Sequence, residues 1–112
     1  MMASLTEQKC VPCEGGVDPM SESEIDAQKA QIPDWQIIKE GENARLQRKF
    51  TFPDFVQAMA FTQSVGEAAE ANGHHPLICL TWGEATVTWW THAIDGLHQN
   101  DFIMAAKTDA LV

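Results

Sequence analysis

The sequence of 112 residues lacks any apolar run of the ~18 residues that a membrane-spanning helix needs. Its first residues, MMASLTEQK, also lack the apolar stretch of a secretory signal. We therefore expect neither a membrane protein nor an exported one, and we predict a cytoplasmic location. The sequence contains no glycine-rich phosphate loop, no nucleophile elbow and no internal repeat. Its length fits one compact domain and leaves no room for a second core.

Basic residues are scarce. Seven Lys and Arg stand against sixteen Asp and Glu, which gives a formal net charge of −9. The only basic cluster lies in residues 34–53, where acidic neighbours balance it. An acidic surface repels phosphate backbones, so we do not expect direct binding to nucleic acid.

The three cysteines are Cys10, Cys13 and Cys79. An odd number without an export signal is most simply a set of reduced thiols. Cys10 and Cys13 have the spacing of half a zinc site, but no second pair follows at a finger-like distance, so we expect no bound metal. A zinc ion shared with His74 or His75 is the alternative. Cys79 lies in a strand pattern and is expected to be a small buried side chain.

Residues 1–20 show no helical or strand period and are interpreted as an irregular arm with a CxxC motif, before a single domain at residues 21–112. The domain has the predicted order α-β-β-α-β-β-α. Hairpins without long crossovers favour an antiparallel sheet with helices on one face. The predicted fold is therefore α+β, with four antiparallel strands, three helices on one face and the other face open. The expected elements are a helix capped at Ser21 and Glu24, strands at 35–39 and 44–52, a helix at 53–72, strands at 77–82 and 85–91, and a helix from about Gln99.

Apolar side chains recur at helical spacing after Pro53, which suits the first position of a helix, and Asn72-Gly73 should end that helix. This stripe predicts the helix face that packs against the sheet. Its members are Phe55, Val56, Met59, Ala60, Val65, Ala68 and Ala69.

Histidines gather near the second hairpin. A turn at residues 83–84 pairs Trp82 with Ala85. Carried to the open end of the hairpin, that register sets His75 opposite His92, with Cβ atoms roughly 5 Å apart. The sequence therefore predicts two imidazoles at one end of the sheet.

More groups lie close to this pair. His74 adjoins His75, Glu70 lies one helical turn earlier, and Trp90 shares a strand face with His92. Because the unperturbed pKa of imidazole is about 6.5, such a cluster can supply both a general acid and a general base. The rival interpretation is a zinc site of three histidines, but adjacent side chains on an extended segment point apart.

Seven typed positions at fixed spacing carry a resemblance to the pterin-4a-carbinolamine dehydratases, which extends from about Ser21 to the C-terminus. The motif is Glu70-x3-His74-His75-Pro76-x5-Trp82-x9-His92-x8-Asp101. The resemblance implies a hydro-lyase that dehydrates 4a-hydroxytetrahydropterins to quinonoid dihydropterins in tetrahydrobiopterin recycling. It implies no cofactor. It also implies three catalytic histidines, His74, His75 and His92, and substrate-binding roles for Glu70, Pro76, Trp82, Trp90 and Asp101.

Asp101 has a second interpretation as half of a capping box three residues after His98. His98, where the family commonly has Ser or Thr, is expected to be a solvated turn residue. Gly73 also departs from the family, in which that position is often acidic.

The resemblance further implies a homodimer or homotetramer and a link to an aromatic amino-acid hydroxylase. Some members of the family bind a hydroxylase or a transcription factor. A non-catalytic module that stabilises such a partner is therefore the alternative function.

Overall fold

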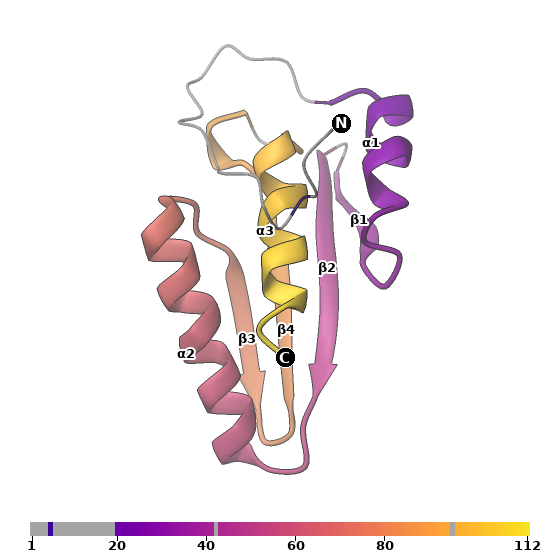
Figure 1. Ribbon diagram of the computed structural model, residues 1–112. Coiled ribbons are helices and arrows are strands. Elements are labelled where there is room, and N and C mark those ends of the chain that lie inside the picture. Colours follow the sequence, from indigo (N-terminus) through magenta and orange to yellow (C-terminus); the bar gives the residue numbers. More distant parts are fainter. Residues whose placement is uncertain (1–4, 6–19, 42, 95) are drawn as a thin grey trace.

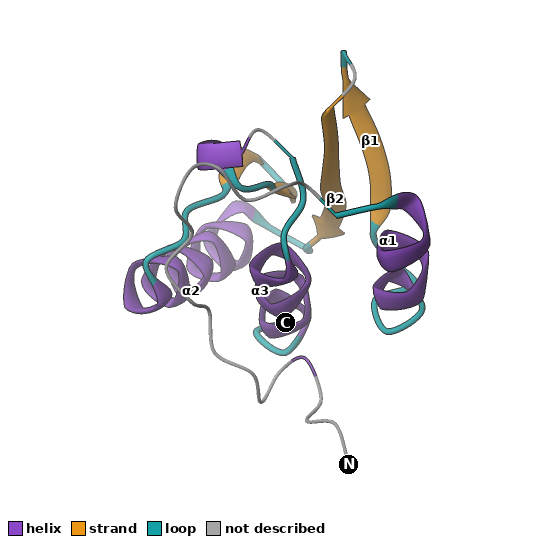
Figure 2. Ribbon diagram, turned by 90° about the horizontal axis from the view of Figure 1, so that it is seen from above, coloured by secondary structure: helices purple, strands orange, loops and turns teal. Residues whose placement is uncertain are grey.

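The structure is a computed structural model that describes residue 5 and residues 20–41, 43–94 and 96–112. Four antiparallel strands form one sheet, and the three helices lie on one of its faces (Figures 1 and 2). The predicted α+β fold and element order are confirmed. The elements are α1 (Glu22–Lys29), β1 (Gln36–Glu40), β2 (Asn43–Thr51), α2 (Phe55–Asn72), β3 (Leu77–Thr81), β4 (Glu84–Trp89), a 3-10 helix (His92–Ile94) and α3 (Gln99–Asp109).

Capping groups set the helix ends. Ser21 and Glu24 form the predicted capping box of α1, each side chain bonding the other's backbone N–H. Helix α2 begins two residues later than predicted, because Asp54 is its N-cap and Pro53 lies before it. Gly73 ends α2 as predicted, with a φ of 64° that a residue with a Cβ adopts at a cost.

The strand order is β1-β2-β4-β3, so β2 and β4 are central and β1 and β3 are the edges. The predicted register of the second hairpin is wrong by two residues. Thr81 pairs with Glu84, and the turn is therefore Trp82-Gly83. The reason lies in β2, because Glu84 also pairs with Thr51 and is thereby held in the sheet.

Gly83 approaches the backbone of the chain that leaves β2. The Phe52 N–H donates to the Gly83 carbonyl over 2.8 Å. A Cβ on Gly83 would lie 3.0 Å from the Phe52 carbonyl oxygen. A side chain at position 83 would strain this close approach. The turn is therefore Trp82-Gly83, with the glycine as its second residue, and not the predicted pair of residues 83–84.

The corrected register changes what faces the histidines. The ladder of β3 and β4 ends at Leu77 and Thr88 in a register that does not lead to the predicted pairing of His75 with His92. A shift of two residues keeps each side chain on its own face, because the side-chain period of a strand is two. Trp90 and the threonines of β4 therefore stay on the face opposite the buried core, although Thr88 on that face is itself buried.

The core lies between the sheet and helices α2 and α3. Leu46 and Phe50 of β2 and Val87 and Trp89 of β4 are buried on the helix side. On α2 the buried residues are Ala58, Phe61, Val65 and Ala69.

The predicted packing stripe of α2 is therefore correct in its second half and wrong in its first. Phe55, Val56 and Met59 are 41%, 70% and 47% exposed, and Ala60 is exposed as well. Helix α2 is apolar on more than one side, and the strands it packs against select the side that is buried.

Two cysteine predictions fall outside the described residues, since Cys10 and Cys13 lie in the first 19. Cys79 is exposed on the edge strand β3, which corrects the expectation of burial. Leu5, the one described residue before Met20, is 2% exposed and packs in the hydrophobic core. No described helix is long and apolar enough to cross a membrane.

Candidate active site

His74 is a buried imidazole held from two sides. It follows the C-cap of α2, and its backbone N–H donates to the Ala69 carbonyl over 3.1 Å. Its Nε2 lies 2.6 Å from Oδ1 of Asp101. Its ring stacks on Trp89, with centroids 5.6 Å apart and planes inclined by 9°. The orientation of His74 is therefore set by both a hydrogen bond and a ring stack.

Asp101, at the first turn of α3, is fully buried and receives three hydrogen bonds. Besides His74, its carboxylate accepts from Thr91 Oγ1 over 2.8 Å and from the His98 backbone N–H over 2.9 Å. The predicted half of a capping box is thus present, and the same carboxylate also holds His74. Charge-assisted hydrogen bonds of this kind are about twice as strong as neutral ones.

His98 is the N-cap of α3 rather than a solvated turn residue. Its Nδ1 accepts from the Asn100 backbone N–H over 3.1 Å, and the side chain is partly buried. An imidazole nitrogen therefore replaces the usual Ser or Thr oxygen at this cap.

His75 is exposed and has its own carboxylate. Its Nε2 lies 2.8 Å from Oε1 of Glu70, with side-chain exposures of 61% and 78%. Glu70 lies in the last turn of α2, so the helix end brings the carboxylate to the imidazole. This hydrogen-bonded pair is open to water and contributes little to stability.

His92, in the 3-10 helix that follows β4, contacts an indole instead of a carboxylate. Its ring centroid lies 4.4 Å from that of Trp90, and the planes are inclined by 33°. The Arg45 guanidinium carbon lies 4.0 Å from the Trp90 ring centroid. Each of the three histidines thus has a different support.

These groups gather at one end of the sheet, where β3 starts, β4 stops and α3 begins. Pro76 lies there as well, between His75 and the first residue of β3. Trp82 does not. It lies in the turn at the far end of the same hairpin, where it is 70% exposed.

The carboxylates determine which ring nitrogen is available for chemistry. An ionised carboxylate only accepts hydrogen bonds, so Nε2 of His74 and Nε2 of His75 carry the protons that face Asp101 and Glu70. In the neutral tautomer the lone pair is then on Nδ1 of each ring. Both imidazoles can therefore accept a proton at Nδ1.

A metal centre is not built from the described part of the chain. Among residues 5, 20–41, 43–94 and 96–112, no group of three or more His, Cys, Asp or Glu side chains could hold an ion. The three-histidine zinc site weighed from the sequence is therefore not formed.

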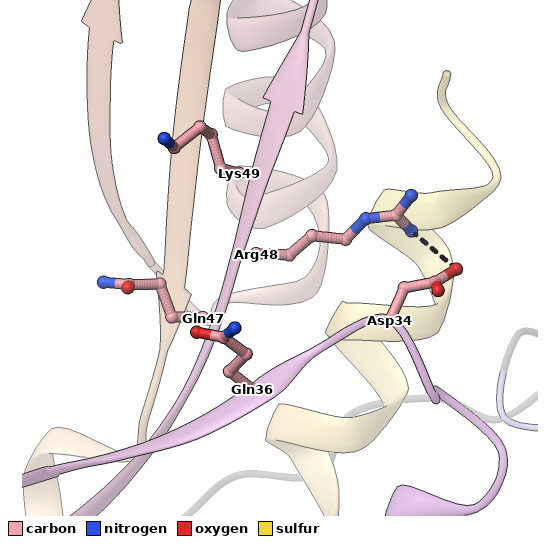
Figure 3. Close-up of a pocket in the computed structure, with 5 residues that line it drawn as sticks. All are labelled: Asp34, Gln36, Gln47, Arg48 and Lys49. Carbon is pink, nitrogen blue, oxygen red and sulfur yellow. Dashed lines mark ion pairs between the residues drawn. The ribbon is translucent and has the colours of Figure 1, made fainter.

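A polar cavity of about 380 Å³ opens where β1 starts (Figure 3). In Figure 3 the Arg48 side chain points away from those of Gln47 and Lys49, toward Asp34, with which it forms an ion pair of 3.7 Å. None of the candidate residues lines this cavity, so it is separate from the histidine site. Its lining consists of Asp34, Gln36, Gln47, Arg48 and Lys49.

Two residues of the site were not found from the sequence. Thr91 immediately precedes His92, and only its bond to Asp101 reveals its role. Arg45 lies on β2, and the pairing of β2 with β4 brings it beside Trp90. Neither has a local sequence signal that could have identified it.

Apart from Trp82, the residues of the motif on which the resemblance rests lie at this end of the sheet. A sequence profile described as pterin 4 alpha carbinolamine dehydratase matches residues 18–111. The chain belongs to this family.

Curated relatives named for pterin-4-alpha-carbinolamine dehydratase match over nearly the full length. The protein of Chlorobium limicola is 53% identical over 110 residues, which cover 98% of this chain and 97% of the relative. The protein of Microcystis aeruginosa is 52% identical over 108 residues, covering 96% of this chain and 93% of the relative. The family assignment therefore applies to the whole chain.

Among solved structures, the transcriptional coactivator/pterin dehydratase from Brucella melitensis is similar with a TM-score of 0.76 and 30% identity. The match covers 84% of this chain and 98% of that one. A pterin dehydratase-like RuBisCO assembly factor of the alpha-carboxysome has a TM-score of 0.59 at 24% identity, over 70% and 88% of the two chains. That second likeness shows the fold alone.

Proposed function

We propose that this protein dehydrates a 4a-hydroxytetrahydropterin to the quinonoid dihydropterin by histidine general acid–base catalysis, in tetrahydrobiopterin recycling. In this reaction the 4a C–O bond breaks, the hydroxyl leaves as water after gaining a proton, and N5 loses its proton. The reaction needs one proton donor and one proton acceptor. It needs no electron carrier and no group carrier.

The observation that carries the proposal is the set of three separately supported imidazoles at one end of the sheet. A general acid or base acts best when its orientation is fixed and its proton can exchange. His75 and His92 are exposed, so both can meet a ligand and exchange protons with water. We assign them as the essential pair.

His74 is 9% exposed, and Asp101 occupies its Nε2. We assign it the supporting role of accepting a hydrogen bond or a proton from the pterin at Nδ1. Glu70 orients His75 through its contact with Nε2, as Asp101 orients His74. Pro76 and Trp90 border the ligand. The distant position of Trp82 gives its predicted binding role no support.

The test is the rate of dehydration of a freshly generated 4a-hydroxytetrahydropterin, followed by ultraviolet absorbance. Wild type should accelerate the reaction, and His75→Gln and His92→Gln should each lose roughly 100-fold or more of that rate. Circular dichroism should show both variants folded, because both side chains are exposed. A wild-type rate no faster than the uncatalysed reaction would reject the dehydratase.

The second candidate function is an interaction module, and the exposed apolar side of α2 favours it. Phe55, Val56 and Met59 share the first turns of that helix and are 41%, 70% and 47% exposed. Clustered apolar exposure is typical of protein contacts. We propose that this surface joins copies of the chain into a homodimer or homotetramer, and that it can instead take a hydroxylase or transcription-factor partner.

Light scattering of wild type and of Met59→Asp tests whether this surface of α2 joins copies of the chain. Assembly through α2 predicts a larger wild-type particle and a smaller variant that still binds and dehydrates pterin. The exposed Gln63→Asp, one turn further along α2, is the matched control. A cytoplasmic location and a pathway link to an aromatic hydroxylase stay predictions.

A further inference from the structure

His92 differs from the other two histidines of the site in having an indole as its support. Within the described residues, its contact is with the ring of Trp90, at 4.4 Å between centroids. His74 and His75 are each held by a carboxylate at less than 3 Å. The orientation of an exposed imidazole in a short 3-10 helix therefore depends on that stack.

Trp90 is itself braced on the other strand. Arg45 of β2 lies beside it because Leu46 pairs with Trp89, which continues the register to Arg45 and Trp90. The guanidinium carbon is 4.0 Å from the ring centroid, a close cation–π contact. Besides this cation–π contact, Arg45 has a further interaction in the structure. The cation–π contact and the contact between the rings of Trp90 and His92 link the three side chains, which we call the Arg45-Trp90-His92 stack.

We propose that Trp90, braced by Arg45, is the positioning residue that fixes the orientation of the His92 imidazole. The kinetic part of this inference rests on the proposed dehydratase function. The structural part does not, because it concerns contacts within the chain. Trp90 is half-buried, so part of the side chain that contacts His92 stays accessible.

The kinetic consequence is a loss that appears mainly in kcat. A catalytic group displaced by about 1 Å costs as much as 100-fold in rate. Trp90→Leu removes the ring but keeps an apolar side chain at the border of the ligand, so kcat should fall about 10- to 100-fold, and the lost ring contact with the pterin should raise KM by a smaller factor. Trp90→Phe keeps a ring face for His92 and should retain kcat within about threefold.

Arg45 supplies the matched comparison of charges on β2. Arg45→Met removes the cation over the indole and keeps an apolar stem, and it should lower kcat about two- to fivefold. Lys49→Met removes another cation from the same face of β2, four residues further along the strand, and should leave kcat unchanged. Lys49 lies 3.9 Å from Glu84 and outside the stack.

A spectroscopic measurement tests the stack without reference to activity. The ring current of Trp90 should shift the His92 ring protons upfield in the proton–carbon NMR spectrum of the wild type. Trp90→Leu should abolish that shift, Trp90→Phe should keep part of it, and Lys49→Met should not change it. His92→Gln identifies the signals.

The outcomes separate the two claims. His92 ring signals that are the same in wild type and Trp90→Leu would overturn the inference whatever the activity. A wild-type kcat in Trp90→Leu, with His92→Gln inactive, would overturn it as well. If wild type does not dehydrate the pterin at all, the proposed function fails, and the NMR shifts then test only whether the Trp90 ring lies against the His92 imidazole.

Discussion

Nε2 of His74 and Oδ1 of Asp101 lie 2.6 Å apart although 27 positions separate the two residues in the chain. The carboxylate that caps α3 is thus the one that holds the buried imidazole at the end of α2. The Asp101 side chain joins the end of α2, the helix that carries Glu70, to the start of α3. Folding of α3 and ordering of the site are therefore coupled.

The first prediction concerns this carboxylate. Asp101→Asn replaces an acceptor of three hydrogen bonds by an amide with a single acceptor oxygen, which leaves a buried donor unpaired. We expect a loss of stability of about 1–3 kcal/mol in urea unfolding. We also expect turnover to fall roughly 100-fold, because His74 is no longer held in one orientation.

Thr91→Val is the milder companion, since it removes one of the three donors and keeps the volume. It should lower turnover about threefold to tenfold, in proportion to the weaker hold on Asp101. Thr88→Val, three residues earlier on β4 and also buried, removes a hydroxyl that contacts Gln47 instead and should keep full turnover. Equal losses in Thr91→Val and Thr88→Val would contradict a specific role for Thr91.

The second prediction concerns the exposed pair. Glu70→Gln should change the free energy of unfolding by less than about 0.5 kcal/mol, because both side chains are open to water. Turnover should nevertheless fall about threefold to tenfold, since the amide no longer fixes the tautomer of His75. A double-mutant cycle with His75→Gln measures the coupling. Additive effects on turnover would show that Glu70 acts independently of His75.

The third prediction is a pH dependence at α1. Hydrogen bonds from the Ser21 backbone N–H and then from its hydroxyl lower the pKa of the Glu24 carboxyl below its usual value of 4.5. A lowered pKa in the folded state stabilises the fold above the unfolded pKa, and the effect is lost as the pH falls through the folded pKa. Ser21→Ala should therefore raise the pKa of Glu24.

The stability difference between wild type and Ser21→Ala should accordingly be larger at pH 7 than at pH 3. Carbon NMR titration of the Glu24 carboxyl and thermal unfolding at both pH values measure the two effects. Asp26→Asn, at an exposed position of the same helix, is the control. A Glu24 titration curve that is the same in wild type and in Ser21→Ala would contradict the role of the Ser21 hydroxyl in lowering the Glu24 pKa.

The fourth prediction compares two glycines. Gly83→Ala should destabilise the protein by about 1 kcal/mol or more, because its Cβ would lie 3.0 Å from the Phe52 carbonyl oxygen. Gly66→Ala, inside α2 with open space around the added Cβ, should stabilise it by about 0.5–1 kcal/mol. Urea unfolding of both variants provides the comparison, and opposite signs are expected.

Much of the fold could be predicted because it depends on local signals. The capping box at Ser21, the glycine cap at Gly73 and the alternation along β2 each act over a few residues, and all three are found. The errors occur where a distant partner decides. The second hairpin turns at Gly83 because β2 holds Glu84, and α2 buries Phe61 rather than Val56 because the sheet selects one of two apolar sides.

The candidate site divides in the same way. The sequence by itself indicated that the histidines and Glu70 would gather near one end of the sheet, because strand ends and helix ends are local features, and only the family resemblance added Asp101. Only the tertiary structure decided which partner each imidazole has. Asp101 with His74 and Arg45 with Trp90 are contacts between segments far apart in the chain, and no local period specifies them.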